Sequence, residues 1–346
     1  MQNSVAVEKN YDKNNLKKNS QSGKYRINKE NKFKKNIALI SIALLIFTIL
    51  FLIVGVNFSH FDYAMRQRIP KIIAMILTGG CIAFSSVIFQ TITNNNILTP
   101  SVLGLDSLYV LVQTVIVFVL GVDSSFITNK SSNFLLSVIV MVMASVLLYK
   151  KLFQKSGSNI FTLLLIGMIA GTLFKSMSTF MQVVIDPNEY AALQNSLYAS
   201  FGNINTEILI IAVVILIITI PFIYDDMKTL DVISLGKDHA INLGVDYDRV
   251  VKKMIILVAI LVSVSTALIG PITFLGLLVT NITKQMFKTY KHSYLIVSSI
   301  LISILTLVAG QFFVERVFSF STTLSVIINF LGGIYFIYLL LKESKE

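Results

Sequence analysis

The sequence predicts an all-α integral membrane protein with about ten transmembrane helices. Of the 346 residues, 55% are hydrophobic and only 14% are charged, which leaves too little polar surface for a water-soluble fold of this size. Apolar windows of about 20 residues recur along the chain, and each is long enough to cross a bilayer. Basic residues gather in alternate connecting segments, as the positive-inside rule requires.

The first 35 residues are a basic stretch rich in Lys, Asn and Ser, without periodicity. Ten of the 29 Lys and Arg residues lie there, so we expect a disordered cytoplasmic tail over 1–35 and a polytopic domain over 36–346. The tail is too long and too polar for the n-region of a cleaved signal peptide, and the first span should be retained. Because the charge is so placed, the net +11 does not predict a nucleic-acid partner, and the expected medium is the lipid bilayer.

Ten apolar segments are predicted as spans, and the Gly270-Pro271 pair separates the seventh from a short eighth. They are Asn36–Val56, Ile69–Thr91, Val102–Gly121, Asn133–Lys150, Ile160–Ile185, Thr206–Tyr224, Val251–Gly270, Ile272–Phe287, Tyr294–Phe313 and Thr323–Leu341. The single cysteine, Cys81, lies inside the second, so no intramolecular disulfide framework is expected.

Charge fixes the predicted orientation. With the N-terminus inside, 23 of the 29 basic residues face the cytoplasm, which predicts a multi-pass protein of the cytoplasmic membrane with both termini cytoplasmic. Five basic residues then lie outside and one lies within a span. The outer five are Arg66, Arg68, Lys71, Lys130 and Arg316, and the one within a span is Lys175.

The sequence disfavours several mechanisms of transport and catalysis. The acids Asp106, Asp186 and Glu207 fall at span ends, whereas an ion-coupled carrier normally keeps a carboxylate at mid-membrane. GxSxG, HExxH and the P-loop are absent, and the three histidines are expected in exposed loops. We therefore predict no enzyme activity, catalytic residue, metal or cofactor in this chain. ATP and Mg²⁺ are expected on a partner subunit.

A polar segment, SLGKDHAINLGVD, interrupts the apolar chain within the loop 225–250. Ile233, Gly236, Ala240, Leu243 and Tyr247 recur at helical spacing and predict one small, mostly apolar face. Gly236 and the glycine at 244 can bracket the helix. On the cytoplasmic side such a helix suits a groove on a soluble partner, and the alternative is a helix lying in the lipid interface.

At this loop the chain resembles the FecCD/BtuC-type permeases, the type II membrane subunits of ATP-driven importers for ferric siderophores, haem and cobalamin. Their pattern LGxxxAxxLGV is matched by Leu235, Gly236, Ala240, Leu243, Gly244 and Val245. Four further motifs lie along the chain in the family's order. RIPK resembles RxPR, and Gln90 with NNNILTPSVLGLDS resembles Q…RNPLAxPxxLG. GPITFLGLLVTNITK resembles GxIxFxGLxxPHxxR, and FLGGIYFIYLLL resembles GxPxFxxLL.

The resemblance implies the permease of an ABC importer for a ferric siderophore, with haem, cobalamin and an ion-coupled carrier as alternatives. The six residues of the loop motif would couple the chain to cytoplasmic ABC ATPase subunits. A second permease, the same or a paralogous chain, and an extracytoplasmic siderophore-binding lipoprotein are the other implied partners. Asn94 and Asn95 replace the usual Arg, Thr280-Asn281 replaces Pro-His, and Ile334 replaces the last Pro, as in a divergent two-permease branch.

The fifth span carries a polar stripe. Thr172, Lys175, Thr179 and Gln182 share one helical face, and Gly167 with the glycine at 171 forms a GxxxG pair opposite them that permits close packing. A lysine facing lipid is costly, so the stripe is predicted to line a translocation pathway or meet a partner subunit. The alternative is a lysine bonded to a carbonyl of a neighbouring span.

The outer basic residues gather in two places that topology does not require. The resemblance implies that Arg68, Lys71 and Arg316 receive glutamates of the binding protein, and Arg66 lies beside them in sequence. The alternative is arginine snorkelling to lipid headgroups.

Overall fold

The structure, a computed structural model, describes residues 33–56, 58–122, 124, 129–156, 160–198, 200–202 and 204–343. The tail predicted over 1–35 therefore lies almost wholly outside the described residues. By its internal contacts the chain forms two units, residues 1–43 and residues 44–346. The described residues of the first unit are the start of a helix, Phe33–Ile53, and all later helices belong to the second unit.

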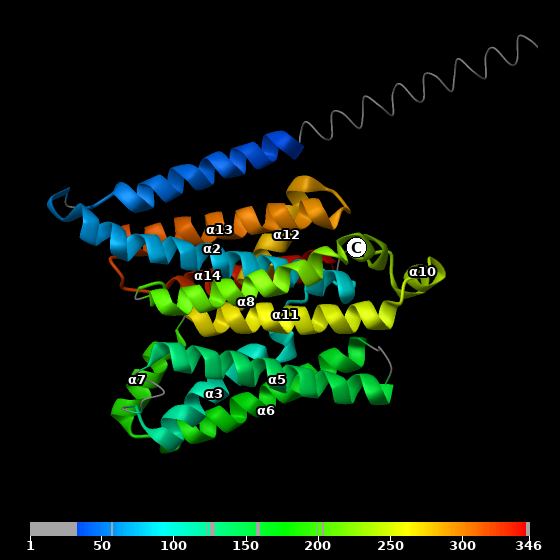
Figure 1. Ribbon diagram of the computed structural model, residues 1–346, viewed down its shortest axis with the longest axis horizontal. Coiled ribbons are helices and arrows are strands. Elements are labelled where there is room, and N and C mark those ends of the chain that lie inside the picture. The colour runs from blue at the N-terminus through cyan, green and yellow to red at the C-terminus, as the bar shows by residue number, and fades with distance from the viewer. Residues whose placement is uncertain are drawn as a thin grey trace, which may run out of the picture. The chain divides into compact units, whose positions relative to one another are not determined.

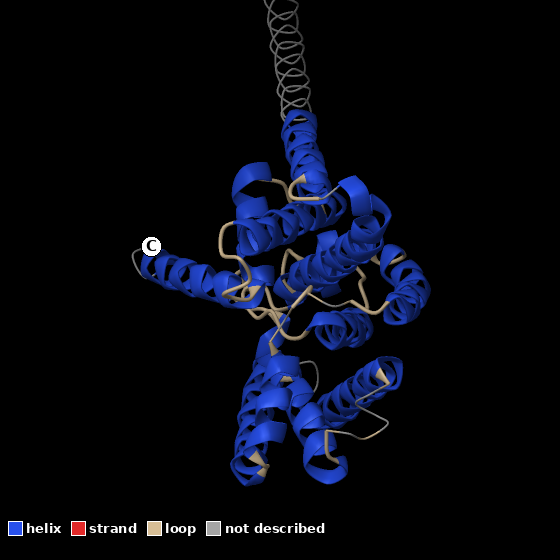
Figure 2. Ribbon diagram, turned by 90° about the vertical axis from the view of Figure 1, so that its left-hand side faces the viewer, coloured by secondary structure: helices blue, strands red, loops and turns tan. Residues whose placement is uncertain are grey.

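The described residues form helices and turns without any strand (Figures 1 and 2). After the helix Phe33–Ile53, the elements are η1 (Phe58–His60), α2 (Phe61–Ile92), η2 (Pro100–Leu103), α3 (Leu105–Leu120), α5 (Lys130–Ser156), α6 (Ile160–Val184), α7 (Pro187–Leu197), α8 (Thr206–Tyr224), α9 (Met227–Ile233), α10 (Lys237–Asn242), α11 (Tyr247–Ile269), α12 (Leu275–Phe287), α13 (His292–Arg316) and α14 (Leu324–Glu343).

Each predicted span coincides with one helix. Within the described residues, eight helices are long and apolar enough to cross a membrane, and the other two predicted spans are α3 with 16 residues and α12 with 13. At 1.5 Å per residue α3 is about 24 Å long, less than the hydrocarbon thickness of about 30 Å. The segment before it, including η2, must therefore be shielded by protein, and it packs against α6, α2 and α11.

α2 is the central helix of one group. It packs against α11, α13 and α12, and Figure 1 shows α2, α11 and α13 running side by side. Small residues permit the close approach, since a Cβ on Gly276 of α12 would lie 2.0 Å from Oγ of Ser86 on α2. Met75, Phe89 and Met254 fill the space around these contacts and are fully buried.

A second group consists of α3, α5 and α6. α3 packs on α6 and α5, and α5 joins this group to the first through α11 (Figure 1). Asp106, Asp186 and Glu207 fall in the first turn or at the cap of α3, α7 and α8, at helix ends as the sequence predicts. The short helices α7 and α9 lie outside the predicted spans and were not anticipated.

Candidate functional site

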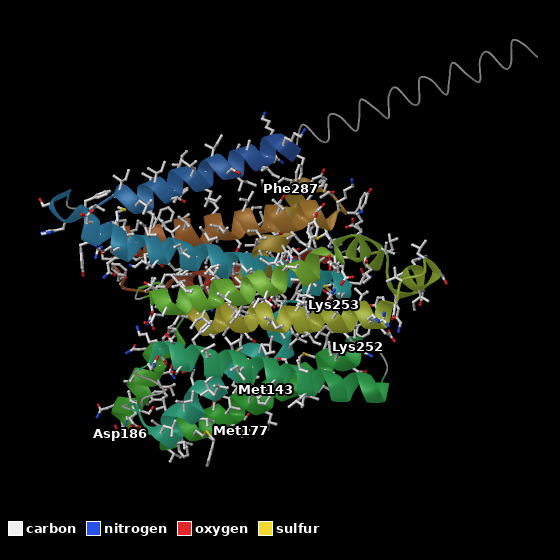
Figure 3. The ribbon with its side chains drawn as sticks, viewed as in Figure 1. Met143, Met177, Asp186, Lys252, Lys253 and Phe287 are labelled. Carbon is white, nitrogen blue, oxygen red and sulfur yellow. The ribbon has the colours of Figure 1, made fainter. Side chains whose placement is uncertain are left out.

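The segment between α8 and α11 folds into two short helices, α9 and α10. Gly236 precedes α10 with φ of 99° and Gly244 follows it with φ of 85°. The two glycines thus bracket α10 in backbone conformations where an L side chain would be strained. α10 lies at the end of the bundle where α11 begins (Figure 1), and Lys252 and Lys253 lie at the same end (Figure 3). We call this end of the bundle the α10 end.

The structure divides the small apolar face that the helical spacing predicts for α10. Ile233 and Ala240 are 1% and 0% exposed and belong to the core cluster shared with α11, because a small face fits against the chain's own helices. Leu235, Ile241 and Leu243 are instead 57%, 49% and 64% exposed. These three exposed apolar side chains are named the apolar trio. Ala240 is not part of it.

A buried polar network lies behind α9, and it corrects the expectation for one histidine. His60 and His239 are exposed as expected, but His292 is only 2% exposed. Oδ1 of Asp231 on α9 accepts from the backbone N–H of His292 at 2.7 Å and lies 2.6 Å from its Nδ1. Nε2 of His292 lies 2.7 Å from Oγ1 of Thr91 on α2. One imidazole thus ties α9 to α13 and α2.

A second network joins two of the sequence motifs. Nζ of Lys284 on α12 donates to Oε1 of Gln90 at 2.7 Å and to Oδ1 of Asn96 at 2.6 Å. Nε2 of Gln90 donates to Oγ1 of Thr280 and to the carbonyl of Asn96, and Asn281 donates to the same carbonyl. The asparagine-rich connection after α2 is therefore fixed to α12, and Thr280 and Asn281, two departures from the family pattern, take part in the fixing.

The glycine side of α6 packs as predicted. A Cβ on Gly104, whose φ is 77°, would lie 2.8 Å from Cα of Gly171, and a Cβ on Gly167 would lie 3.0 Å from Cα of Leu103. The GxxxG pair of α6 therefore admits the backbone at the η2–α3 junction into direct contact, which larger residues would prevent.

The polar side of α6 is open in the isolated chain. Thr172, Lys175 and Thr179 are exposed, and the two threonine hydroxyls donate to carbonyls one turn back. Gln182 departs from this face, because its Nε2 donates to Oγ1 of Thr114 on α3 at 3.0 Å. Three of the four predicted pathway residues thus form one exposed face, and Gln182 is half-buried against α3.

The basic residues at the other end of the bundle gather as predicted, but they already have partners. Nη1 of Arg68 donates to the carbonyls of Phe51, Leu52 and Val54 at 2.6, 2.9 and 3.0 Å. Arg316 donates from Nη2 to the same carbonyl of Val54. Arg68 therefore satisfies the last carbonyls of the helix that ends at Ile53, which a helix terminus leaves unpaired, and both guanidinium groups meet at the carbonyl of Val54 just beyond that end.

Lys71 is also engaged within the chain. Its Nζ lies 3.2 Å from Oε1 of Glu315, and the two side chains are 12% and 8% exposed. Gln311 donates to the same carboxylate oxygen at 3.1 Å. Arg66 is exposed. The sequence had no signal for the role of Glu315, because its partner lies 244 positions away.

Comparison with known proteins gives one family. The FecCD transport family matches residues 36–342. The petrobactin import system permease protein YclO of Bacillus subtilis (strain 168) is 60% identical over 290 residues, which are 84% of this chain and 92% of YclO. The petrobactin import system permease protein FatC of Bacillus anthracis is 39% identical over 290 residues, which are 84% of this chain and 82% of FatC.

A solved structure has the same fold. It is a metal-chelate type ABC transporter in an inward-facing conformation, with a TM-score of 0.75 and 22% identity, and the match covers 90% of this chain and 99% of the solved chain. The helices, the ordered motifs and the match over residues 36–342 agree. This chain belongs to the FecCD transport family.

Proposed function

We propose that this chain is the membrane permease subunit of an ATP-binding-cassette importer that carries a ferric siderophore across the cytoplasmic membrane. The observation that carries the proposal is the 60% identity over 290 residues with a permease named for petrobactin import. FatC, at 39%, has the same substrate in its name, whereas a vitamin B12 permease of Vibrio parahaemolyticus is 26% identical. This order favours an iron chelate, petrobactin first, over cobalamin.

The apolar trio is the proposed coupling surface for the ATPase. Leu235 and Leu243 belong to the family's loop motif and both are more than half exposed, as a short helix seated in a partner's groove requires. Gly236, Ala240, Gly244 and Val245 act by shaping α10, since Ala240 is buried and the glycines set its ends. Hydrolysis of ATP, with its Mg²⁺, belongs to the partner subunit.

The outer face of α6 is the proposed surface for a second permease chain. Phe161, Phe180 and Val183 on this helix are 81%, 71% and 81% exposed, so the face is apolar enough to pack against a partner. Lys175 lies among them, and an ammonium group facing lipid would be costly. A partner that encloses an aqueous path beside Thr172, Lys175 and Thr179 removes that cost, whether it is the same chain or a paralogue.

The end of the bundle opposite α10 is the proposed docking side for the binding lipoprotein, which places both termini and α10 in the cytoplasm. A reporter enzyme fused after Ser158 should then be active inside the cell, and one fused at Ser124 should be active outside. The reverse pattern would overturn the orientation and the assignment of α10.

Co-purification and uptake test the function together. The full chain, purified in mild detergent from its own cells, should bring down an ABC ATPase and a permease. Deleting the gene should abolish uptake of radiolabelled ferric petrobactin and leave cobalamin uptake unchanged. Recovery without any ATPase would favour the ion-coupled alternative, and loss of cobalamin uptake alone would reassign the substrate.

A further inference from the structure

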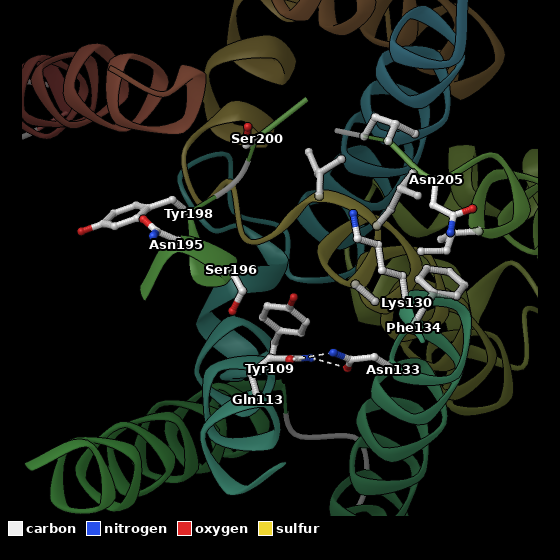
Figure 4. A pocket seen from close by; sticks show the side chains of 15 residues that line it. Tyr109, Gln113, Lys130, Asn133, Phe134, Asn195, Ser196, Tyr198, Ser200 and Asn205 are labelled. Carbon is white, nitrogen blue, oxygen red and sulfur yellow. Dashed lines mark hydrogen bonds between the residues drawn. The ribbon is translucent and has the colours of Figure 1, made fainter. Parts of the chain in front are cut away.

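A cavity of about 350 Å³ lies at the end of the bundle opposite α10. It is bordered by α3, α5, the end of α7 and the segment that follows it, the start of α8 and the last residues of α11, as Figure 4 shows. No lining residue comes from α6, so the cavity is separate from the exposed polar face of that helix. Its volume falls at the lower end of the range for small-molecule sites, about 300–1,000 Å³.

Two polar groups point into this cavity without a hydrogen-bond partner among the described residues. The hydroxyl of Tyr109 and the ammonium of Lys130 both face the space between the helices in Figure 4. Tyr109 is only 6% exposed. A buried phenol normally finds a hydrogen-bond partner, so the Tyr109 hydroxyl is open to one from outside the chain. Lys130 is exposed and adds a positive charge to the lining.

The wall beside Tyr109 is held rigid by its own hydrogen bonds. Gln113, 5% exposed, donates to Oδ1 of Asn133 at 2.9 Å and to Oγ of Ser137 at 2.8 Å, and it accepts from Nδ2 of Asn133 at 3.2 Å. These contacts fix α3 against α5 one turn from Tyr109. The cavity is thus preformed, which lowers the entropic cost of binding.

The groups that Lys130, Tyr109 and Asn205 leave for a ligand are mostly donors. Oδ1 of Asn205 already accepts from the backbone N–H of Glu207 at 2.7 Å, which leaves the amide hydrogens of Asn205. Tyr109 and Lys130 add a hydroxyl and an ammonium. Glu207 is not among the lining residues, and its Oε2 accepts from Ser131 at 2.9 Å. With donors on one side and no carboxylate in the lining, the fitting ligand is an anion that accepts hydrogen bonds.

The opposite part of the lining is apolar. Phe134 and Ile208 are 2% and 9% exposed, and Leu268 lies beside them in the wall. We infer that the cavity is a binding site for a small monocarboxylate with an aromatic or branched apolar body. Its carboxylate meets Lys130, Tyr109 and Asn205, and its body packs on Phe134. The bound ligand joins the α7–α8 connection to α5 and α3. The inference goes beyond the proposed transport function and does not rest on it.

Ligand binding is measured on the full complex in nanodiscs of phosphatidylcholine, without ATP, so transport does not enter the readout. Benzoate is the probe, benzamide its uncharged isostere and inorganic phosphate the anion without an apolar body. Saturating benzoate should raise the thermal unfolding temperature of the complex. Benzamide and phosphate should bind at least roughly tenfold more weakly than benzoate.

The variants Tyr109→Phe and Lys130→Gln should each weaken the apparent Kd for benzoate by roughly tenfold. The matched controls are Tyr290→Phe and Lys252→Gln, which change the same residue types at the α10 end, where both are exposed, and these should leave it unchanged. Absence of saturable benzoate binding would overturn the inference. Benzamide binding as tightly as benzoate would also overturn it, as would an equal loss of benzoate affinity in the control variants. So would a rise in the unfolding temperature caused by phosphatidylserine in the nanodisc without benzoate.

Discussion

The two ends of the bundle look alike in sequence, since each carries a cluster predicted to receive a partner, yet the structure separates them. At the α10 end, Leu235 and Leu243 are 57% and 64% exposed and the residue between them, Ala240, is fully buried. At the other end, Arg68 donates to three carbonyls of its own chain and Lys71 pairs with Glu315. One surface is open and apolar, and the other is charged and already satisfied.

This contrast determines how each kind of surface can bind. Covering exposed Leu and Ile is favourable by about 25 cal/mol per Å² of apolar area and requires no bond to break. A glutamate from a binding protein must instead compete with the internal partners of Arg68 and Lys71. The α10 end should therefore contribute affinity, and the basic end should contribute selectivity and rate of encounter.

The largest effect is expected at the apolar trio. Leu243→Arg places a charge on the proposed coupling surface and should remove ATPase association and lower siderophore uptake more than tenfold, because a desolvated unpaired charge is costly in an interface. Membrane insertion and the thermal unfolding of the permease should stay unchanged. Co-purification of the ATPase measures the first outcome.

Two neighbouring variants sharpen this result. Asn242→Arg changes an exposed polar residue of the same helix and should be mild. Ala240→Arg forces a bulky cation into the packed core and should lower the yield of folded protein. Normal uptake by Leu243→Arg, or equal loss in Asn242→Arg, would show that the trio is not the coupling surface.

At the basic end the largest effect should come from Arg68→Glu combined with Arg316→Glu. Repulsion of the glutamates proposed on the binding protein should weaken its affinity more than tenfold. The two arginines also bind carbonyls at or just beyond the end of the helix that ends at Ile53, so thermal unfolding must be followed in parallel. Rescue by basic residues on the binding protein, with unchanged unfolding, identifies docking. A lowered unfolding temperature without rescue identifies a structural role alone.

The pair Lys71–Glu315 tests whether the basic end is held together internally. Glu315→Gln leaves a lysine that is 12% exposed without its carboxylate and should lower the free energy of unfolding by about 3 kcal/mol. The double change Lys71→Met with Glu315→Leu removes both charges and should restore most of the loss. Unfolding by denaturant in nanodiscs measures the stability of both variants. An unchanged free energy of unfolding in Glu315→Gln would show that the pair is open to water.

The spans and the order of the motifs followed from the sequence because hydropathy and glycine spacing are local. The close packing at Gly167 and Gly171 is of this kind, since GxxxG spacing predicts a small face, whereas the neighbour it meets, Gly104, is known only from the structure. The direction in which Ala240 faces could not be deduced the same way. A small apolar face suits both a partner's groove and the chain's own α11, and only the long-range fold decides between them.

Polar contacts between residues far apart in the sequence could not be predicted, for the same reason. His292 was predicted as an exposed histidine because it lies just before a predicted span, but its partners Asp231 and Thr91 are 61 and 201 positions away. The bonds from Lys284 to Gln90 and Asn96 likewise cross 194 and 188 positions. Lys284, Gln90 and Asn96 all lie in segments that match the family motifs. The motifs therefore indicated where this network lies, and its contacts became known from the structure.

The network behind α9 supports the α10 end from inside. His292→Leu removes the ring that joins Asp231 to Thr91 and should destabilise the fold by about 2 kcal/mol, since the carboxylate of Asp231 loses its imidazole partner while Thr91 keeps its bond to the carbonyl of Val87. Thr91→Val removes one hydroxyl and should cost about 1 kcal/mol. Hydrogen exchange of the α9–α10 backbone should rise in His292→Leu, and unchanged exchange there would mean that α9 is held by packing alone.

The smallest effect is expected at Arg66, which is exposed beside the satisfied cluster. An exposed ion pair contributes about 0.2–1 kcal/mol, so Arg66→Gln should weaken binding-protein affinity by less than about fivefold. Because the Debye length falls to about 3 Å at 1 M salt, the difference from wild type should vanish at high salt and appear mainly in the association rate. Arg66 would then raise the association rate of the binding protein, and Arg68 and Arg316 would determine the lifetime of the complex. A large, salt-independent loss in Arg66→Gln would place the docking contact at Arg66, and the internally bonded arginines would then be purely structural.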